Sequence, residues 1–159
     1  LGFRSAAMQL SIKTSYENGE IEDFLKELKK RSGDFRPVFK KIRDDLEQIW
    51  ANNFLVGGLE SGAKWDALDP EYAAWKAKND PNPILMRSGK TLFRSLRSLK
   101  GKPNMIRKNY AIFGTDVPYA KFHQMGTSKM PKRQIIFEPR GANEKWGHWA
   151  VEYLQESEK

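Results

Sequence analysis

The sequence predicts a single α+β domain over residues 1–159, in which amphipathic helices accompany a few short strands. In several stretches apolar residues recur every three or four positions, which is the spacing of an amphipathic helix. In shorter stretches they alternate with polar residues, which is typical of a strand with one exposed face. A chain of 159 residues can bury enough apolar surface to fold without disulfides.

The first third of the chain is predicted to be mainly helical. Residues 8–12 alternate like a short strand. Helical spacing then predicts one helix from Glu20 to about Arg31 and a longer one from Asp34 to about Phe54. Glycines at three nearby positions predict a flexible loop or arm around residues 55–66.

The middle of the chain is predicted to change between helices and strands. A short helix is expected to begin at Asp69-Pro70, and an amphipathic helix or helix pair to span Ile84 to Leu99. Residues 106–113 alternate like a strand, and residues 131–137 are expected to form a second strand.

Two further helices complete the prediction. Asp116 is expected to cap a short helix and Gly126 to end it, with Tyr119 and His123 on one helical face. Around residues 143–156, tryptophan and tyrosine side chains recur at helical spacing. This C-terminal helix is expected to dock its aromatic face on the core of this chain or on a neighbouring subunit.

Positive charge is concentrated in one part of the chain. Between Met86 and Tyr110 there are eight basic residues and no acidic one, while the whole chain has a net charge of +8. Four of them recur at steps of three and four, so they share one face of the helix predicted over residues 84–99. These four are Arg87, Lys90, Arg94 and Arg97. They are candidates for contacting DNA or an acidic partner, and the alternative is a merely solvated face.

The composition excludes several chemistries. The chain has no cysteine, which excludes a disulfide scaffold, a thiol nucleophile and a cysteine zinc site. It has two histidines and lacks the H-E-x-x-H, phosphate-loop and serine-elbow motifs, so we expect no metal, no cofactor and no catalytic residue. His123 is the strongest catalytic candidate, but on a short helix a histidine more often bonds a backbone carbonyl. No apolar run approaches the roughly 20 residues that span a bilayer, so a soluble protein is expected.

Three groups of residues form an ordered pattern between positions 65 and 137. They are Trp65, Leu68, Tyr72 and Lys76; then Ile84-Leu85, Ser88-Gly89, Leu92 and Ser95; then Tyr119-Ala120, His123-Gln124, Gly126, Pro131 and Arg133. In this order and spacing, the pattern resembles the bacteriophage virion morphogenesis family, which contains tail-completion and head-to-tail joining proteins.

The resemblance implies both a fold and a role. The implied fold is an α+β subunit with a small, mainly antiparallel sheet packed by helices. The implied role is that of a structural, non-enzymatic virion protein at the head-tail junction, whether in tail completion, as a tail terminator or in the neck. The pattern does not separate these roles. In this interpretation the residues of the three groups organise the fold.

The resemblance also implies partners. The expected assembly is a homo-oligomeric ring, expected to be a hexamer, that contacts tail tube, sheath or neck and connector proteins. Genomic DNA is expected to pass through such a ring, and no membrane is involved. The expected location is the tail or neck of the virion, after assembly in the host cytoplasm. A DNA-binding protein that acts without sequence preference through its basic helix face is the alternative.

Overall fold

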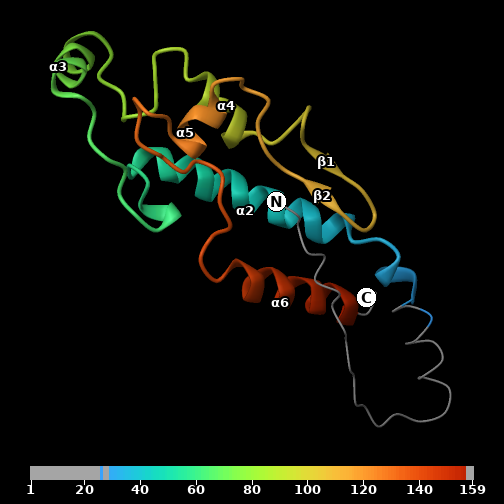
Figure 1. Ribbon diagram of the computed structural model, residues 1–159. Coiled ribbons are helices and arrows are strands. Elements are labelled where there is room, and N and C mark those ends of the chain that lie inside the picture. Colours follow the sequence, from blue (N-terminus) through green and yellow to red (C-terminus); the bar gives the residue numbers. More distant parts are fainter. Residues whose placement is uncertain (1–25, 27–28, 157–159) are drawn as a thin grey trace.

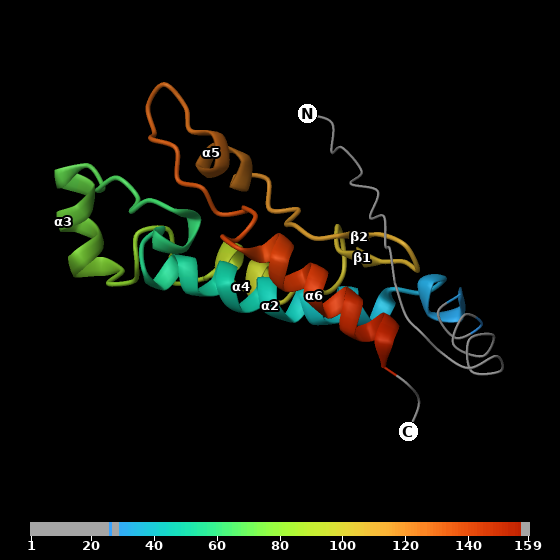
Figure 2. The same cartoon turned by 90° about the horizontal axis from the view of Figure 1, so that it is seen from below.

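A computed structural model describes residue 26 and residues 29–156 of the protein, and its elements gather around one long helix (Figure 1). Helix α2 spans Arg36–Leu55 and runs through the middle of the molecule. Helix α6, Ala142–Gln155, lies along one side of α2, and helix α4, Thr91–Arg97, packs against another side (Figures 1 and 2). The long helix predicted from residue 34 is therefore confirmed.

The remaining elements are short. The 3-10 turn η1 spans Leu59–Ser61, helix α3 Pro70–Asn79 and helix α5 Ala120–Met125. Strands β1, Met105–Ile106, and β2, Ala111–Ile112, form an antiparallel pair with Met105 opposite Ile112. Helices with one small antiparallel sheet confirm the predicted α+β class.

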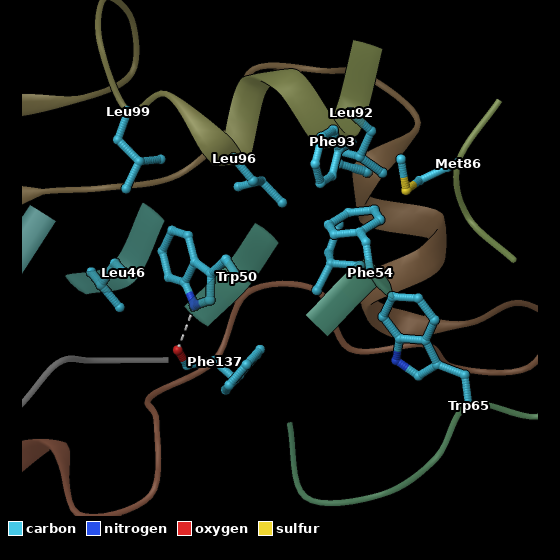
Figure 3. Packing of buried hydrophobic residues seen from close by; sticks show 12 residues of the cluster. Leu46, Trp50, Phe54, Trp65, Met86, Leu92, Phe93, Leu96, Leu99 and Phe137 are labelled. Atoms are coloured by element: carbon cyan, nitrogen blue, oxygen red, sulfur yellow. Dashed lines mark hydrogen bonds between the residues drawn. The ribbon is translucent and has the colours of Figure 1, made fainter. Parts of the chain in front are cut away.

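The core lies between one stripe of α2 and the helices and loops that cover it (Figure 3). Leu46, Trp50 and Phe54 follow one another at intervals of four, so they project from the same side of α2. The Phe54 ring meets both Trp65 and Phe93 edge to face, with centroids 5.7 Å apart in each pair. Aromatic rings favour this arrangement because the positive edge of one faces the negative face of the other.

Helix α6 docks its aromatic face on α2 of the same chain. The Asp45 carboxylate accepts hydrogen bonds from Lys145 Nζ at 2.6 Å and from Trp146 Nε1 at 2.9 Å. Near the other end of α6, the Tyr153 hydroxyl donates to the Asp34 carbonyl at 2.9 Å. The predicted C-terminal helix is confirmed, and its docking partner is this chain.

The strand predicted over residues 131–137 is wrong, because side chains occupy the backbone groups that a neighbouring strand would bond. Trp65 Nε1 and Asn53 Nδ2 both donate to the Gln134 carbonyl, at 3.2 and 3.1 Å. Trp50 Nε1 donates to the Phe137 carbonyl at 3.0 Å. The alternating pattern is real, since Ile135 and Phe137 are buried, but it reflects insertion between helices and loops.

The single strand predicted over residues 106–113 is also wrong, since the chain folds back within it. The Arg107 amide donates to the Tyr110 carbonyl at 2.9 Å, which closes a hairpin between β1 and β2. Asn109 lies in this turn, and asparagine is among the residues that turns favour. The Lys108 carbonyl accepts a bond from the Phe35 amide at 2.6 Å, which ties the hairpin to the start of α2.

The helix predicted over residues 84–99 is confined to its second half. Two turns precede α4, closed by bonds from the Met86 amide to the Pro83 carbonyl at 2.8 Å and from the Lys90 amide to the Arg87 carbonyl at 2.7 Å. Lys90 has a left-handed backbone with φ of 51°, which a right-handed helix cannot contain. The basic residues therefore do not share one helical face.

The start of the short helix α5 differs from the prediction, and its end agrees. The Val117 amide donates a hydrogen bond to the Thr115 hydroxyl at 3.2 Å, and not to the Asp116 carboxylate as predicted. Helix α5 begins only at Ala120 and has no side-chain cap. Gly126 ends it with φ of 74°, in the left-handed region that glycine tolerates best.

Some predictions lie outside the described residues. One is the strand predicted at residues 8–12. Another is most of the helix predicted from Glu20 to about Arg31. Within and just after that range, residues 26 and 29–32 are described, and they are helical. The loop at residues 55–66 contains η1, and its Trp65 is buried. The flexibility of this loop and the single-domain organisation of the whole chain stay predictions.

Replacing Phe54 by alanine should lower the free energy of unfolding by about 3 to 5 kcal/mol, because a fully buried ring would leave a cavity. Its neighbour Leu55 is 59% exposed, so Leu55→Ala is the matched control and should cost less than about 1 kcal/mol. Denaturant unfolding followed by circular dichroism measures both variants. Equal losses in the two would show that this stripe is not the core.

Candidate docking groove

A groove of about 760 Å³ lies between α3, the turns before α4, and α5 with the loop that follows it. Residues from all three motif groups line it. The lining residues are Ala67, Leu68, Asp69, Tyr72, Ile84, Leu85, Arg87, Gly89, Lys90, Thr91, Leu92, Tyr119, Phe122, His123, Lys129, Met130, Pro131 and Arg133. Motif residues that lie more than 60 positions apart in sequence thus meet at one site.

The groove combines apolar and cationic side chains. Its apolar lining includes Leu68, Ile84, Leu85, Leu92 and Met130. Three lysine and arginine side chains are at least partly open to solvent around it, namely Arg87, Lys90 and Lys129. One carboxylate, that of Asp69, also lines it. An apolar surface flanked by cations can bind a ligand that carries both apolar and acidic groups.

The carboxylate of Asp69 is used to begin α3. It accepts hydrogen bonds from the Glu71 and Tyr72 amides at 3.0 and 3.2 Å, which is a helix N-cap. With Pro70 at the first helical position, these contacts fix where the helix begins and place Tyr72 on the groove side. The Tyr72 ring stacks on Trp75 with centroids 5.7 Å apart.

Lys76 joins the end of α3 to the turn that forms the next wall. This buried side chain donates to the Asp80 carbonyl at 3.0 Å and to the Met86 carbonyl at 2.6 Å. Its Nζ also lies 3.6 Å from the buried Asp80 carboxylate. The Asp80 carboxylate in turn accepts from the Asn82 side chain and from the Ser88 amide. The bond from Asn82, followed by the charge of Lys76, lowers the pKa of Asp80 and favours its ionised form.

Helix α5 supplies the opposite wall. Ala120 is buried in the core, which orients the helix so that Tyr119, Phe122 and His123 line the groove. The Tyr119 and His123 rings meet edge to face with centroids 6.1 Å apart. His123 Nδ1 is buried, and no hydrogen-bond partner reaches it from the described part of the chain. Burial, and then the nearby Arg133 charge, lower the pKa of His123, so its ring is neutral near pH 7.

Gln124 holds the buried segment that follows the groove. Its side-chain oxygen accepts from the Ile135 and Ile136 amides, both at 2.9 Å, and its side-chain nitrogen donates to the Ile136 carbonyl at 2.7 Å. One glutamine therefore replaces part of the hydrogen bonding that a neighbouring strand would give.

Gly126 and Arg133 close the loop between α5 and this segment. A Cβ at position 126 would lie 2.9 Å from the Lys132 amide nitrogen, so a side chain is excluded there. The Arg133 amide donates to the His123 carbonyl at 2.7 Å. Its buried guanidinium donates to the Asp66 and Ala67 carbonyls at 3.0 Å each, which ties the α5 side of the groove to the α3 side.

The predicted set of basic residues is divided by the structure. Arg87 and Lys90 line the groove, whereas Arg94 and Arg97 lie exposed on α4 and are not among its lining residues. Arg97 lies over the Phe93 ring at 5.9 Å from its centroid, and Arg87 over the Trp75 ring at the same distance. The prediction of one continuous basic face is wrong because the helix begins only at Thr91.

Some motif residues line the groove, and the others support its walls. Tyr72, Gly89, Tyr119, His123 and Arg133 line the groove. Trp65, Lys76, Ala120, Gln124 and Gly126 support it from behind, as does the Ser88 amide through its bond to Asp80.

Lys129 and Met130 line the groove, although neither is among the candidate residues that the sequence analysis singled out. The sequence signal for them was a large apolar methionine within an otherwise polar loop. Reciprocal bonds between the Thr127 and Met130 backbones, at 2.8 and 3.3 Å, fold that loop back towards the groove.

Residues 26 and 29–156 contain neither a candidate metal site nor a candidate membrane-spanning helix. No group of three or more histidine, aspartate or glutamate side chains in this part of the chain could hold a metal ion. No helix within it is long and apolar enough to cross a membrane.

The comparisons with known proteins agree with one another. The model of the phage virion morphogenesis family matches residues 16–148. A protein of Haemophilus influenzae, "Mu-like prophage FluMu G protein 1", is 30% identical over 129 residues, which cover 80% of this chain and 84% of that protein. No solved structure matches.

Replacing Gln124 by leucine should destabilise the fold, because two backbone amides and one carbonyl would lose their partners. The expected loss is roughly 2 to 4 kcal/mol in the free energy of unfolding. Gln124→Glu keeps the accepting oxygen and should lose less. Chemical denaturation of both variants tests this, and an unchanged midpoint for Gln124→Leu would contradict the assigned role.

The pH dependence of stability tests the environment of His123. Because its folded pKa is lowered, the unfolded chain binds the proton more tightly, and stability should fall as pH drops through the unfolded value of about 6.5. The fall should level off below the folded pKa. In His123→Gln this component should disappear, whereas the control His148→Gln, which changes an exposed histidine, should keep it. Denaturant midpoints between about pH 8 and pH 5 measure the difference. Identical pH profiles for His123→Gln and the unchanged chain would contradict it.

Proposed function

The chain belongs to the phage virion morphogenesis family, and from this premise we propose that it is a structural protein of the head-tail junction that acts through contacts and not through catalysis. The proposed assembly is a ring of identical subunits at the upper end of the tail or in the neck. There it would enable heads and tails to join, through contacts above, below and beside the ring.

The use of the motif polar groups supports a structural role. Lys76 and Arg133 each donate to two backbone carbonyls, and Gln124 bonds two amides and one carbonyl. A catalytic group must be free to exchange protons or bonds with a substrate. These side chains are instead committed to holding the backbone. This is the observation on which the proposal depends.

Two of the three acidic residues of α2 are committed in the same way. Asp45 binds Lys145 and Trp146 of α6, and Glu47 Oε1 accepts from the Leu99 amide at 2.7 Å. These carboxylates therefore connect α2 to its neighbours, which leaves them poorly placed to activate a substrate.

Exposed aromatic and apolar side chains supply surface for assembly. Tyr72 and Trp75 on α3 and Tyr119, Phe122 and Met125 on or beside α5 are all exposed, with Met125 at 77%. Large apolar side chains gathered at one place on a surface are typical of protein interfaces. A ring neighbour or a tail component would cover them.

A second candidate function is DNA binding without sequence preference, and the exposure of the remaining basic residues between positions 94 and 108 favours it. Arg94 and Arg97 on α4, Lys100 and Lys102 after it, and Arg107 and Lys108 in the hairpin turn are all exposed. These six residues, here called the basic surface, could contact phosphates of DNA that passes through the ring.

Changing Arg94 and Arg97 together to glutamate should prevent the joining of heads to tails, because either an acidic partner or DNA would be repelled. Electron microscopy of the particles made with this variant tests the prediction. The matched control reverses two exposed lysines elsewhere, Lys40 and Lys78, and should leave joining intact.

A salt titration with unrelated DNA duplexes then separates the two uses of the basic surface. Binding of similar strength to every duplex, with a steep loss as salt increases, would support the DNA function. Weak binding together with failed joining would support an acidic protein partner. Normal, infectious particles from the Arg94 and Arg97 variant would exclude both and leave a solvated surface.

A further inference from the structure

The chain has an acidic segment near its start, and the charge of this segment is opposite to that of the groove cations. Residues 16–24 contain four acidic side chains, no basic one, and several aromatic or aliphatic side chains. The charged members are Glu17, Glu20, Glu22 and Asp23, and the apolar ones are Tyr16, Ile21 and Phe24. The acidic and apolar groups of this segment complement the cations and the apolar lining of the groove.

Among residues 26 and 29–156, none of Arg87, Lys90 and Lys129 forms an ion pair with a carboxylate. Asp69, the one carboxylate that lines the groove, is occupied by the N-cap of α3. The groove therefore offers positive charge next to an apolar surface, which favours an occupant with the opposite charge.

The groove cannot take this segment from its own chain. It lies towards the Leu55 end of α2, where Arg133 contacts Asp66 and Ala67, whereas residues 29–32 lie at the Arg36 end (Figures 1 and 2). A helix of 20 residues is about 30 Å long. Residues 22–24 are within four positions of residue 26 and can extend at most roughly 14 Å from it. Only a second copy can present the whole segment to the groove.

We propose that the groove of one subunit binds residues 16–24 of a neighbouring copy. In the complex, Ile21 and Phe24 would lie on the apolar lining, and the carboxylates of Glu20, Glu22 and Asp23 would face Arg87, Lys90 and Lys129. The contact joins two different surfaces, and repeating it around an axis produces a ring when the rotation between neighbours closes, as the proposed assembly requires. The inference rests on the proposed function, because it supplies the contact between subunits of the ring.

A direct test measures whether the groove binds the segment as a separate peptide. The probe is a fluorescein-labelled peptide with the sequence of residues 16–24, followed by fluorescence anisotropy. The receptor is the full chain with Glu20→Lys and Glu22→Lys, so that its own segments do not compete. Adding Arg87→Glu and Lys90→Glu to this receptor should weaken binding at least about tenfold. Adding Arg107→Glu and Lys108→Glu, an equal charge change away from the groove, should weaken it much less.

Several outcomes of that measurement would overturn the inference. They are absence of peptide binding, equal binding by both charge-reversed receptors, and preference of the groove for a labelled oligonucleotide over the peptide. Circular dichroism of every receptor shows whether it is folded. A peptide of the same composition in scrambled order distinguishes recognition of the segment from simple charge attraction.

A charge exchange tests the same contact within the assembly. Sedimentation velocity should show smaller species both for Glu20→Lys with Glu22→Lys and for Arg87→Glu with Lys90→Glu, and the combination of all four changes should restore the larger species. If the unchanged chain forms rings that Glu20→Lys with Glu22→Lys leaves intact, the inference fails and the proposed ring survives. If the unchanged chain stays monomeric at every concentration and in particles, the ring itself fails, and the peptide measurement still decides whether the groove binds this segment.

Discussion

The rest of the structure depends on how side chains bond the backbone of residues 134–137. Ile135 is fully buried and Phe137 nearly so, which places their polar backbone groups in the interior. Buried amides and carbonyls that lack partners are costly, and no strand within residues 26 and 29–156 supplies them. Trp50 and Asn53 of α2, Trp65 of the loop and Gln124 of α5 do so instead. One segment thereby fixes three parts of the chain relative to one another.

The groove follows from this arrangement. Once Gln124 has fixed α5 on the buried segment, Arg133 reaches across to the carbonyls before α3, and Lys76 joins the end of α3 to the turn before α4. Each wall is thus connected by buried hydrogen bonds to the next. A binding surface held in this way needs little rearrangement when a partner arrives, which reduces the entropy that binding costs.

Periodicity predicted the long elements well and the short ones poorly, for a physical reason. Helices α2 and α6 repeat an apolar stripe over several turns, and their packing preserves that pattern. Alternation over a few residues predicts only that one side is buried, and it does not reveal whether the backbone bonds another strand or side chains. For the same reason residues 134–137 resembled a strand. The left-handed backbone of Lys90, which ends the helical pattern before α4, has no reliable signal in the residue itself.

The residues of the three motif groups lie in or behind one groove, whereas the four basic residues are divided between the groove and α4. The motif spacing is maintained by contacts between distant segments, such as Arg133 with Asp66, so order along the chain was informative. The basic residues were grouped by helical spacing alone, and the grouping is wrong because α4 begins only at Thr91. Arg87 and Lys90 consequently belong to the groove, while Arg94 and Arg97 face outward on α4. Because only Arg87 and Lys90 line the groove, the proposed contact with a neighbour and the proposed contact through Arg94 and Arg97 would use different side chains.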